Sequence, residues 1–383
     1  MKALILKYLT NEISPSELEL LRKWLKKSDN RTVFQNYIRD AYLLNRSLDS
    51  VQLDTSFKKV WQQIQQQEKP VRKLFKKKAK YALAASVALL VSLAAFFFSQ
   101  QTSVIDKGSQ TIVNNIIKVG TDKATLTTED GRTIVLEKGK TYRSKNIVSN
   151  GTELVYGTEG VSANKAVFNY LTVPRGGEFF LKLADGTKVW MNSESQLRYP
   201  VVFTEGETRK VELVYGEAYF EVSPSSLHKG DKFKVLNKKQ EIEVLGTEFN
   251  IKAYGDESAI YTTLVKGKIS LKAGNTANIL TPDHQAVLDL KLNKVQIREV
   301  DVYNDTAWKE GIFTFESKPL SEIMKVLSRW YDMEVSYGNA QIENTRFNGT
   351  LRKDQKIENV LETIKSFGII KEYKIKNKKI ELK

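Results

Sequence analysis

One long apolar run divides the chain into two unequal parts. Residues 81–98 contain no charged residue, proline or glycine. At about 1.5 Å per residue, a helix over these 18 residues would be roughly 27 Å long, enough to cross the hydrocarbon core of a bilayer. The run begins too far along the chain to be a cleaved signal peptide. The pattern therefore predicts one transmembrane helix.

Basic residues mark one side of this run. The next basic residue after it is Lys107, whereas six precede it closely: Arg72, Lys73, Lys76, Lys77, Lys78 and Lys80. Positive charge accumulates on the cytoplasmic side of single spans. We therefore expect a single-pass protein of the bacterial inner membrane, with the N-terminus in the cytoplasm and the larger C-terminal part outside the membrane. Residues 67–80 form a basic juxtamembrane linker.

Before the linker, residues 1–66 show apolar positions at helical spacing. Ser14-Pro15-Ser16-Glu17 has the residues of a helix start, because serine caps the first N–H groups and proline fits the first turn. The apolar stripes that follow predict a small all-α bundle. A bundle of this size is marginally stable alone, so part of its apolar surface is expected to face a partner. The candidates for that contact are Leu21, Trp24, Phe34 and Tyr37.

Two interpretations of this bundle compete. It is either a membrane-tethered DNA-binding domain or a helical clamp on a cytoplasmic protein. Arg22, Lys23, Lys26 and Lys27 crowd one helix end, where they could contact phosphates. No helix shows the set of base-reading side chains that a recognition helix needs, so the pattern mildly favours the clamp.

The sequence pattern predicts a succession of β-strands from residue 104 to residue 300. Asp130-Gly131 and Asp185-Gly186 each lie between β-rich runs, a strong hairpin signal, and their flanks hint at an internal repeat. Residues 210–215 and 218–222 are among the predicted strands. Alternation of apolar and polar residues predicts an all-β sandwich or coiled sheet.

From residue 308 to 383 helical periodicity returns. Strands are predicted at 311–315, 333–337, 347–350, 372–375 and 379–382, and helices at 319–331 and 355–367. The helical stripes are Leu320, Ile323, Met324, Leu327, Ile357, Val360, Leu361 and Ile364. We expect an α+β domain of two β-α-β halves on one sheet, which leaves a face or an edge free to add a partner strand.

The amino-acid composition limits which kinds of catalytic, metal and cofactor sites the chain can contain. The chain has no cysteine, which excludes disulfides and thiolate catalysis, and only two histidines, His228 and His284. No residue set for an enzyme, a metal site or a cofactor emerges. The formal net charge is +15, but residues 1–80 carry 18 Lys and Arg against 8 Asp and Glu. The exported part is near balance, so no direct binding of nucleic acid is expected there.

Five stretches of the exported part resemble the FecR-type anti-sigma factors. They are Pro174–Pro200, Val211–Val222, Val244–Ile251, Thr263–Ser270 and Trp308–Phe315. The C-terminal α+β domain is similar to the family's usual C-terminal domain. That domain in turn resembles the short N-terminal signalling domain of secretins and of TonB-dependent transporters.

The resemblance implies a signalling role. Such proteins hold an extracytoplasmic-function sigma factor with their cytoplasmic helices. Their periplasmic C-terminal domain is the docking site for the signalling domain of an outer-membrane TonB-dependent transporter. Release commonly runs through stepwise proteolysis that ends with an intramembrane protease.

In some relatives a Gly-Thr bond breaks without a protease. Here Gly246-Thr247 occupies that block, and the threonine hydroxyl would attack the preceding carbonyl. The alternative is that Gly246 simply permits a bend between strands. Cleavage of this bond is therefore a hypothesis that the residues leave open.

Other classes of function compete with the anti-sigma interpretation. The runner-up is a membrane-tethered DNA-binding transcriptional activator with a periplasmic sensor. A third interpretation is an exported module that binds carbohydrate or peptidoglycan. A hydrolase is a fourth, for which no credible residue set is present.

Overall fold

The structure is a computed structural model that describes Trp24 and residues 111–113, 116–144, 146–157, 167–274 and 276–383. The predicted linker, the predicted span at 81–98 and all of residues 1–66 except Trp24 lie outside these residues. Among the helices that the structure describes, none has both the length and the apolar character needed to cross a membrane.

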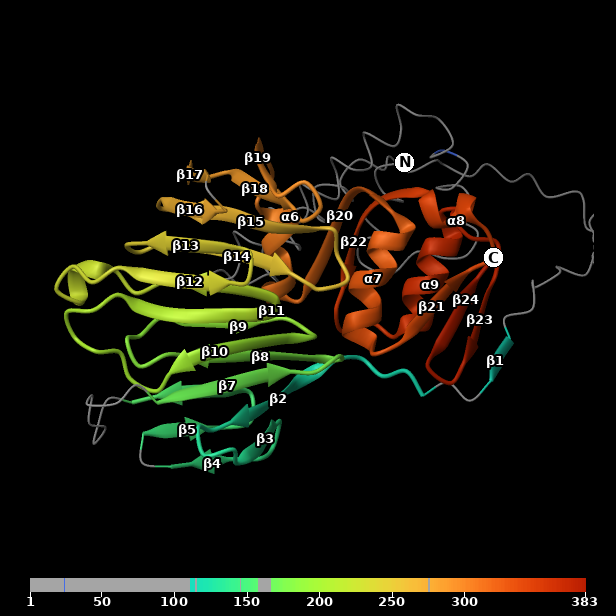
Figure 1. The fold of residues 1–383 in the computed structure, drawn as a ribbon. Helices are drawn as coiled ribbons and strands as arrows, with labels where there is room; N and C mark the ends of the chain where they lie inside the picture. Colours follow the sequence, from blue (N-terminus) through green and yellow to red (C-terminus); the bar gives the residue numbers. More distant parts are fainter. Residues whose placement is uncertain (1–23, 25–110, 114–115, 145, 158–166, 275) are drawn as a thin grey trace, which may run out of the picture. The chain divides into compact units, whose positions relative to one another are not determined.

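Two sheets form the part of the chain between residues 121 and 299, which we call the sandwich (Figure 1). In the first sheet the strands follow the order β17 (Thr276–Leu280), β16 (Ile269–Ala273), β13 (Gln240–Val244), β12 (Phe233–Asn237), β11 (Arg209–Glu221), β10 (Ser195–Pro200), β7 (Phe168–Val173), β2 (Thr121–Thr127) and β3 (Thr133–Glu137).

The second sheet shares β11 with the first. Its order is β19 (Lys294–Glu299), β18 (His284–Asp289), β15 (Ala259–Lys266), β14 (Glu248–Ala253), β11, β9 (Lys188–Met191), β8 (Gly177–Lys182), β6 (Glu153–Tyr156), β5 (Ile147–Ser149) and β4 (Tyr142–Arg143). Apolar residues of both sheets make one core, in which the rings of Phe220 and Phe249 stack 5.2 Å apart. The all-β prediction is confirmed for this part.

Strand β11 corrects one expectation. The predicted strands 210–215 and 218–222 are a single strand of 13 residues. Its first half pairs with β10 and β12, and its second half pairs with β9 and β14. Gly216, with φ of +97°, lies where the strand passes between the sheets. The sequence break at this glycine therefore marks a bend within one strand rather than a loop between two.

Both predicted hairpins are confirmed and share one turn geometry. Asp130-Gly131 joins β2 to β3, and Asp185-Gly186 joins β8 to β9. Gly131 N–H donates to Thr128 O, and Gly186 N–H donates to Leu183 O. Both glycines have positive φ, +80° and +84°, where a residue without Cβ is favoured. The likeness of the two flanks thus extends to their turns.

Residues 303–383 form a second unit with its own core, which we call the C-terminal module. Its elements are α6 (Tyr303–Thr306), η2 (Ala307–Glu310), β20 (Ile312–Pro319), α7 (Leu320–Tyr331), β21 (Glu334–Tyr337), α8 (Ala340–Asn344), β22 (Arg346–Arg352), α9 (Ile357–Ser366), β23 (Tyr373–Lys376) and β24 (Lys379–Leu382). The eight predicted stripe residues of α7 and α9 are all buried, as expected.

The strands of this module correct a second expectation, because they do not share one sheet. β20 and β22 form a two-stranded antiparallel sheet. The other sheet has the order β1 (Thr111–Val113), β23, β24 and β21, so one of its strands comes from far upstream. Alternation along a strand reveals which face is buried but not which strand lies beside it, and the single-sheet prediction failed for that reason.

The bend in β11 predicts a large cost for a side chain at Gly216. A Cβ there would lie 2.2 Å from Ser195 Oγ, and φ is positive. We expect Gly216→Ala to lower the free energy of unfolding by about 3 kcal/mol. Gly131→Ala is the matched control, because φ is also positive but no atom lies within 4 Å. It should cost about 1 kcal/mol. Urea unfolding of the purified protein measures both, and equal losses would contradict the prediction.

Candidate functional site at the junction of sandwich and C-terminal module

Two arginines cross the junction in opposite directions. Arg175, in the turn before β8, donates from its guanidinium to the main-chain oxygens of Ser328 and Met333, both at 2.8 Å. Gly176 N–H donates to Arg329 O at 2.7 Å. The last carbonyls of a helix have no partner within it. The Arg175-Gly176 pair therefore caps the C-terminal end of α7, where positive charge is also favoured.

Arg329, in α7, contacts the sandwich from the other side of the junction. The residue is only 3% exposed. Its guanidinium forms ion pairs with Glu257 at 3.1 Å, with Glu194 at 3.3 Å and with Asp256. It also lies over the ring of Tyr254, 3.7 Å from the centroid. All four partners belong to the sandwich. Guanidinium groups suit such buried, multidentate contacts better than ammonium groups do.

Glu194 is shared by the two arginines. Its carboxylate lies 3.3 Å from the guanidinium of Arg175 and 3.3 Å from that of Arg329. Its φ is +59°, in the left-handed region that residues with a side chain seldom adopt. Strained residues of this kind persist where the surroundings over-determine them. The two arginines provide such surroundings at the junction.

A buried lysine forms a second polar contact between the two units. Lys353 is 3% exposed, and its ammonium group pairs with the carboxylate of Glu178 in β8. The ammonium also lies 4.0 Å from the ring centroid of Trp330, whose indole N–H donates to Lys353 O. Burial lowers the pKa of Lys353, and the charge of Glu178 opposes that shift.

A third polar contact starts at the bend of β11. Glu217 is 8% exposed and accepts hydrogen bonds from the side-chain amides of Asn192 and Asn250, both at 2.9 Å. Asn250 in turn accepts from the indole N–H of Trp308 at 3.3 Å. Burial raises the pKa of Glu217, and the nearby Lys252 opposes the shift. The bend is thus connected by hydrogen bonds to the C-terminal module.

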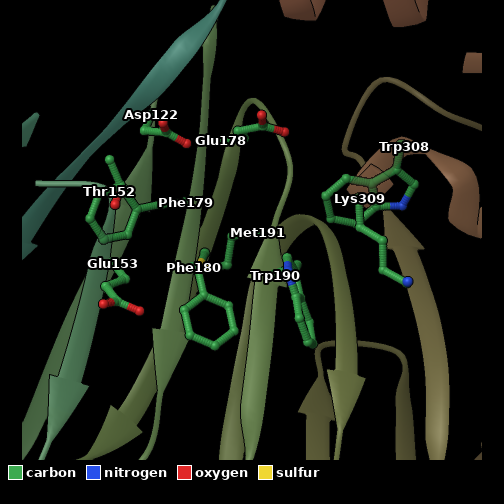
Figure 2. Close-up of a pocket in the computed structure, with 10 residues that line it drawn as sticks. All are labelled: Asp122, Thr152, Glu153, Glu178, Phe179, Phe180, Trp190, Met191, Trp308 and Lys309. Atoms are coloured by element: carbon green, nitrogen blue, oxygen red, sulfur yellow. The ribbon is translucent and has the colours of Figure 1, made fainter. Parts of the chain in front are cut away.

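A cavity of about 320 Å³ opens at the same junction (Figure 2). Figure 2 shows the carboxylates of Asp122 and Glu178 on one side of it and the rings of Phe180 and Trp190 below them. The remaining lining residues are Thr152, Glu153, Phe179, Met191, Trp308 and Lys309. Glu178 is already paired with Lys353, so the charges of Asp122, Glu153 and Lys309 remain along the cavity and single out no ligand class. Among the described residues, no cluster of acidic and histidine side chains could hold a metal ion.

The Gly246-Thr247 bond lies away from these contacts, in the turn before β14. Gly246 has φ of +155°, and a Cβ there would lie 3.0 Å from Cα of Pro224. Thr247 is 4% exposed, and its hydroxyl donates to Lys268 O at 3.2 Å. The neighbouring Glu248 accepts from the hydroxyl of Tyr219 and lies 3.5 Å from Lys266. The hydroxyl of Thr247 thus points its proton at a main-chain oxygen.

Most of the residues predicted to contact a sigma factor lie outside the described residues. Leu21, Phe34 and Tyr37 lie outside them, and Trp24 is helical and half-buried. The structure brings together a set that the sequence analysis did not single out: Arg175, Glu178, Glu194, Glu217, Arg329 and Lys353. Charged residues are no more frequent in the stretch Pro174–Pro200 than in the whole chain, so composition gave no signal for this set; only Gly176, Gly177 and Gly186 stand out there.

The junction predicts unequal roles for two arginines of the C-terminal module. We expect Arg329→Gln to lower the free energy of unfolding by about 3 kcal/mol, because it removes a buried guanidinium and leaves the largely buried carboxylate of Glu257 without this partner. Arg352→Gln is the control, since Arg352 pairs with Asp354 at the surface and its side chain is 71% exposed. It should cost less than about 1 kcal/mol. Urea unfolding followed by tryptophan fluorescence tests this, and a similar loss for both variants would refute it.

Two family models match this chain, one within the sandwich and one within the C-terminal module. A model described as FecR protein matches residues 170–270, and a model described as FecR, C-terminal, matches residues 312–382. Arg175, Glu178 and Glu217 lie in the first range, and Arg329 and Lys353 lie in the second. The junction therefore joins the two matched domains.

Solved structures give a consistent result. Two crystal structures of a candidate anti-sigma factor from Parabacteroides distasonis, at 1.65 and 2.50 Å resolution, match with a TM-score of 0.50 and 27% sequence identity. Each match covers 56% of this chain and 98% of the other. No match was found among curated proteins. The junction described above thus joins a region that matches the FecR protein model to a region that matches the FecR, C-terminal, model.

Proposed function

We propose that this chain is an inner-membrane anti-sigma factor that relays a signal from outside the membrane to a cytoplasmic sigma factor. One observation carries the proposal: both FecR domains occur in one chain, and its solved structural neighbours are described as a candidate anti-sigma factor. A protein of this family is a regulator rather than an enzyme.

The finer assignments extend this proposal. Residues 1–66 bind a sigma factor of the extracytoplasmic-function class, and residues 81–98 cross the inner membrane. The C-terminal module receives the signalling domain of an outer-membrane TonB-dependent transporter in the periplasm. An intramembrane protease completes release of the cytoplasmic piece. The apolar run and its basic flank support the topology.

The junction gives the relay a physical basis. The contacts of Arg175, Arg329 and Lys353 hold the C-terminal module on the sandwich through buried charges. A partner bound to the module therefore acts on both units together. The runner-up, a tethered DNA-binding activator, would use the same exported part as a sensor and differs only in what residues 1–66 bind.

The sigma-factor assignment predicts a specific capture. Residues 1–69, used as bait in cytosol of the native host, should retain one small sigma factor in a stoichiometric amount. The full chain solubilised in detergent should retain the same protein. Trp24→Ala and Phe34→Ala should each reduce the recovered sigma factor about tenfold, whereas Gln63→Ala, in the glutamine-rich run Gln62–Glu68, should not. Mass spectrometry identifies the captured protein, and recovery of DNA would favour the tethered activator instead.

A second proposal concerns the Gly246-Thr247 bond. We propose that Thr247 Oγ attacks the carbonyl carbon of Gly246, which moves the acyl group from nitrogen to oxygen. Water then hydrolyses the ester and leaves a carboxylate on Gly246 and a free amine on Thr247. Gly246 favours this site, because it puts no side chain beside the carbonyl carbon that Thr247 Oγ attacks.

Self-scission predicts a simple pattern of fragments. The purified protein should separate into two pieces on a denaturing gel, with the second beginning at Thr247 by N-terminal sequencing. Thr247→Ala removes the nucleophile and should give one piece, while Thr247→Ser keeps a hydroxyl and should still give two. A single intact band from the unmodified chain would end the proposal.

A further inference from the structure

The strand nearest the predicted span in sequence pairs with a strand near the end of the chain. β1 lies parallel to β23, with Thr111 opposite Lys374, Ile112 opposite Ile375 and Val113 opposite Lys376. Figure 1 shows β1 beside β23 at one edge of the C-terminal sheet. The C-terminal module therefore holds the segment through which the exported part follows the predicted transmembrane helix.

This segment stays with the C-terminal module until it reaches the sandwich. Ile117 and Val119 pack against the core of the module. Gly120 lies so close to Trp330 that a Cβ would be 2.6 Å from the indole ring. Thr121 N–H then donates to Gly176 O at 3.0 Å, next to the cap of α7. We call β1 and residues 116–121 the stalk.

The two parts of the stalk are held differently. Residues 116–121 are held by apolar packing and a close backbone approach, whereas β1 contributes only three residues at a sheet edge. Short contacts at a sheet edge belong to the parts of a protein that open first. When β1 leaves, the main chain of β23 presents the unpaired N–H and C=O groups that a new strand can join.

The charges of β23 indicate which strand would replace β1. Residues Thr111–Val113 carry no charge, whereas Lys374 and Lys376 lie on β23 itself. Lys378 and Lys379, in the turn and in β24, are already paired with Asp332 and Glu334. An extended strand that carries carboxylates would make the same main-chain contacts as β1 and gain attraction from Lys374 and Lys376.

We propose that β1 occupies the docking edge of the C-terminal sheet and that an acidic extended strand of a partner protein displaces it. Displacement leaves residues 116–121 as the remaining attachment of the stalk, so the stalk opens more readily and becomes exposed to proteolysis. The inference rests on the proposed function, since it describes how a signal reaches the predicted span. In this proposal the three residues of β1, which lie close to the predicted span in sequence, are the part of the chain that responds to the partner.

An engineered disulfide tests the pairing. The chain has no cysteine, so a double variant can form only one intramolecular bond. Thr111→Cys with Lys374→Cys places the pair in register, at the strand spacing of about 4.8 Å that a disulfide can bridge. Thr111→Cys with Lys376→Cys is out of register by two residues, roughly 6.6 Å along the strand, and is the control. The in-register pair should oxidise at least about tenfold faster in the full chain. Equal rates would overturn the proposal.

Trypsin tests the release of the stalk. Lys118 is exposed on the held segment, and cleavage there requires local opening. In the full chain in detergent, the in-register disulfide should slow cleavage after Lys118 about tenfold. Ile112→Pro, which cannot keep its edge pairing, should accelerate it about tenfold, and Ile112→Val should leave it unchanged. Cleavage at the same rate in the oxidised and reduced protein would refute the proposal.

A synthetic peptide tests the displacement. An excess of the peptide Glu-Thr-Ile-Val-Glu should accelerate cleavage after Lys118 in the reduced protein and not in the disulfide-bonded protein. The neutral peptide Gln-Thr-Ile-Val-Gln should act more weakly at low salt. Equal acceleration of the disulfide-bonded protein would place docking at another edge, such as β21, and overturn the proposal. None of these measurements involves a sigma factor, so they fail or succeed independently of the capture experiment.

Discussion

Two arginines that contact one shared carboxylate form the interaction on which the arrangement of the sandwich and the C-terminal module depends. Arg175 reaches from the sandwich to the carbonyls at the end of α7, Arg329 reaches from α7 to the sandwich, and Glu194 touches both. Arg329 finds its carboxylate partners in the other unit, and the carbonyls at the end of α7 find their donor there. Loss of one partner within the assembled junction would leave a charge or a helix end buried without its partner.

This interaction gives a physical reason for the stretches that resemble the FecR family. Pro174–Pro200 supplies Arg175, Glu178 and Glu194, all of which act on the C-terminal module. The stretch Val211–Val222 supplies the bend at Gly216 and the buried carboxylate beside it. These residues all lie at the junction. They assemble two domains into one unit.

Local sequence patterns were sufficient to predict the features that depend on contacts between residues close in sequence. The Asp-Gly hairpins and the buried stripes of α7 and α9 were predicted, because turn chemistry and periodicity act within a few residues. The split of the C-terminal strands into two sheets was not, since strand pairing depends on distant partners. The pairing of β1 with β23 and the roles of Arg175 and Arg329 were missed for the same reason. The sigma-binding candidates and the Gly246-Thr247 hypothesis stay predictions.

The pairing of β1 with β23 also sets an order of assembly. A chain is made from its N-terminus, so Thr111–Val113 exist long before Tyr373–Lys376 do. Until the last strands have formed, the edge that receives β1 is missing. The sheet can therefore close only after β23 and β24 have been made. A chain that stopped before these strands would keep its stalk open to degradation.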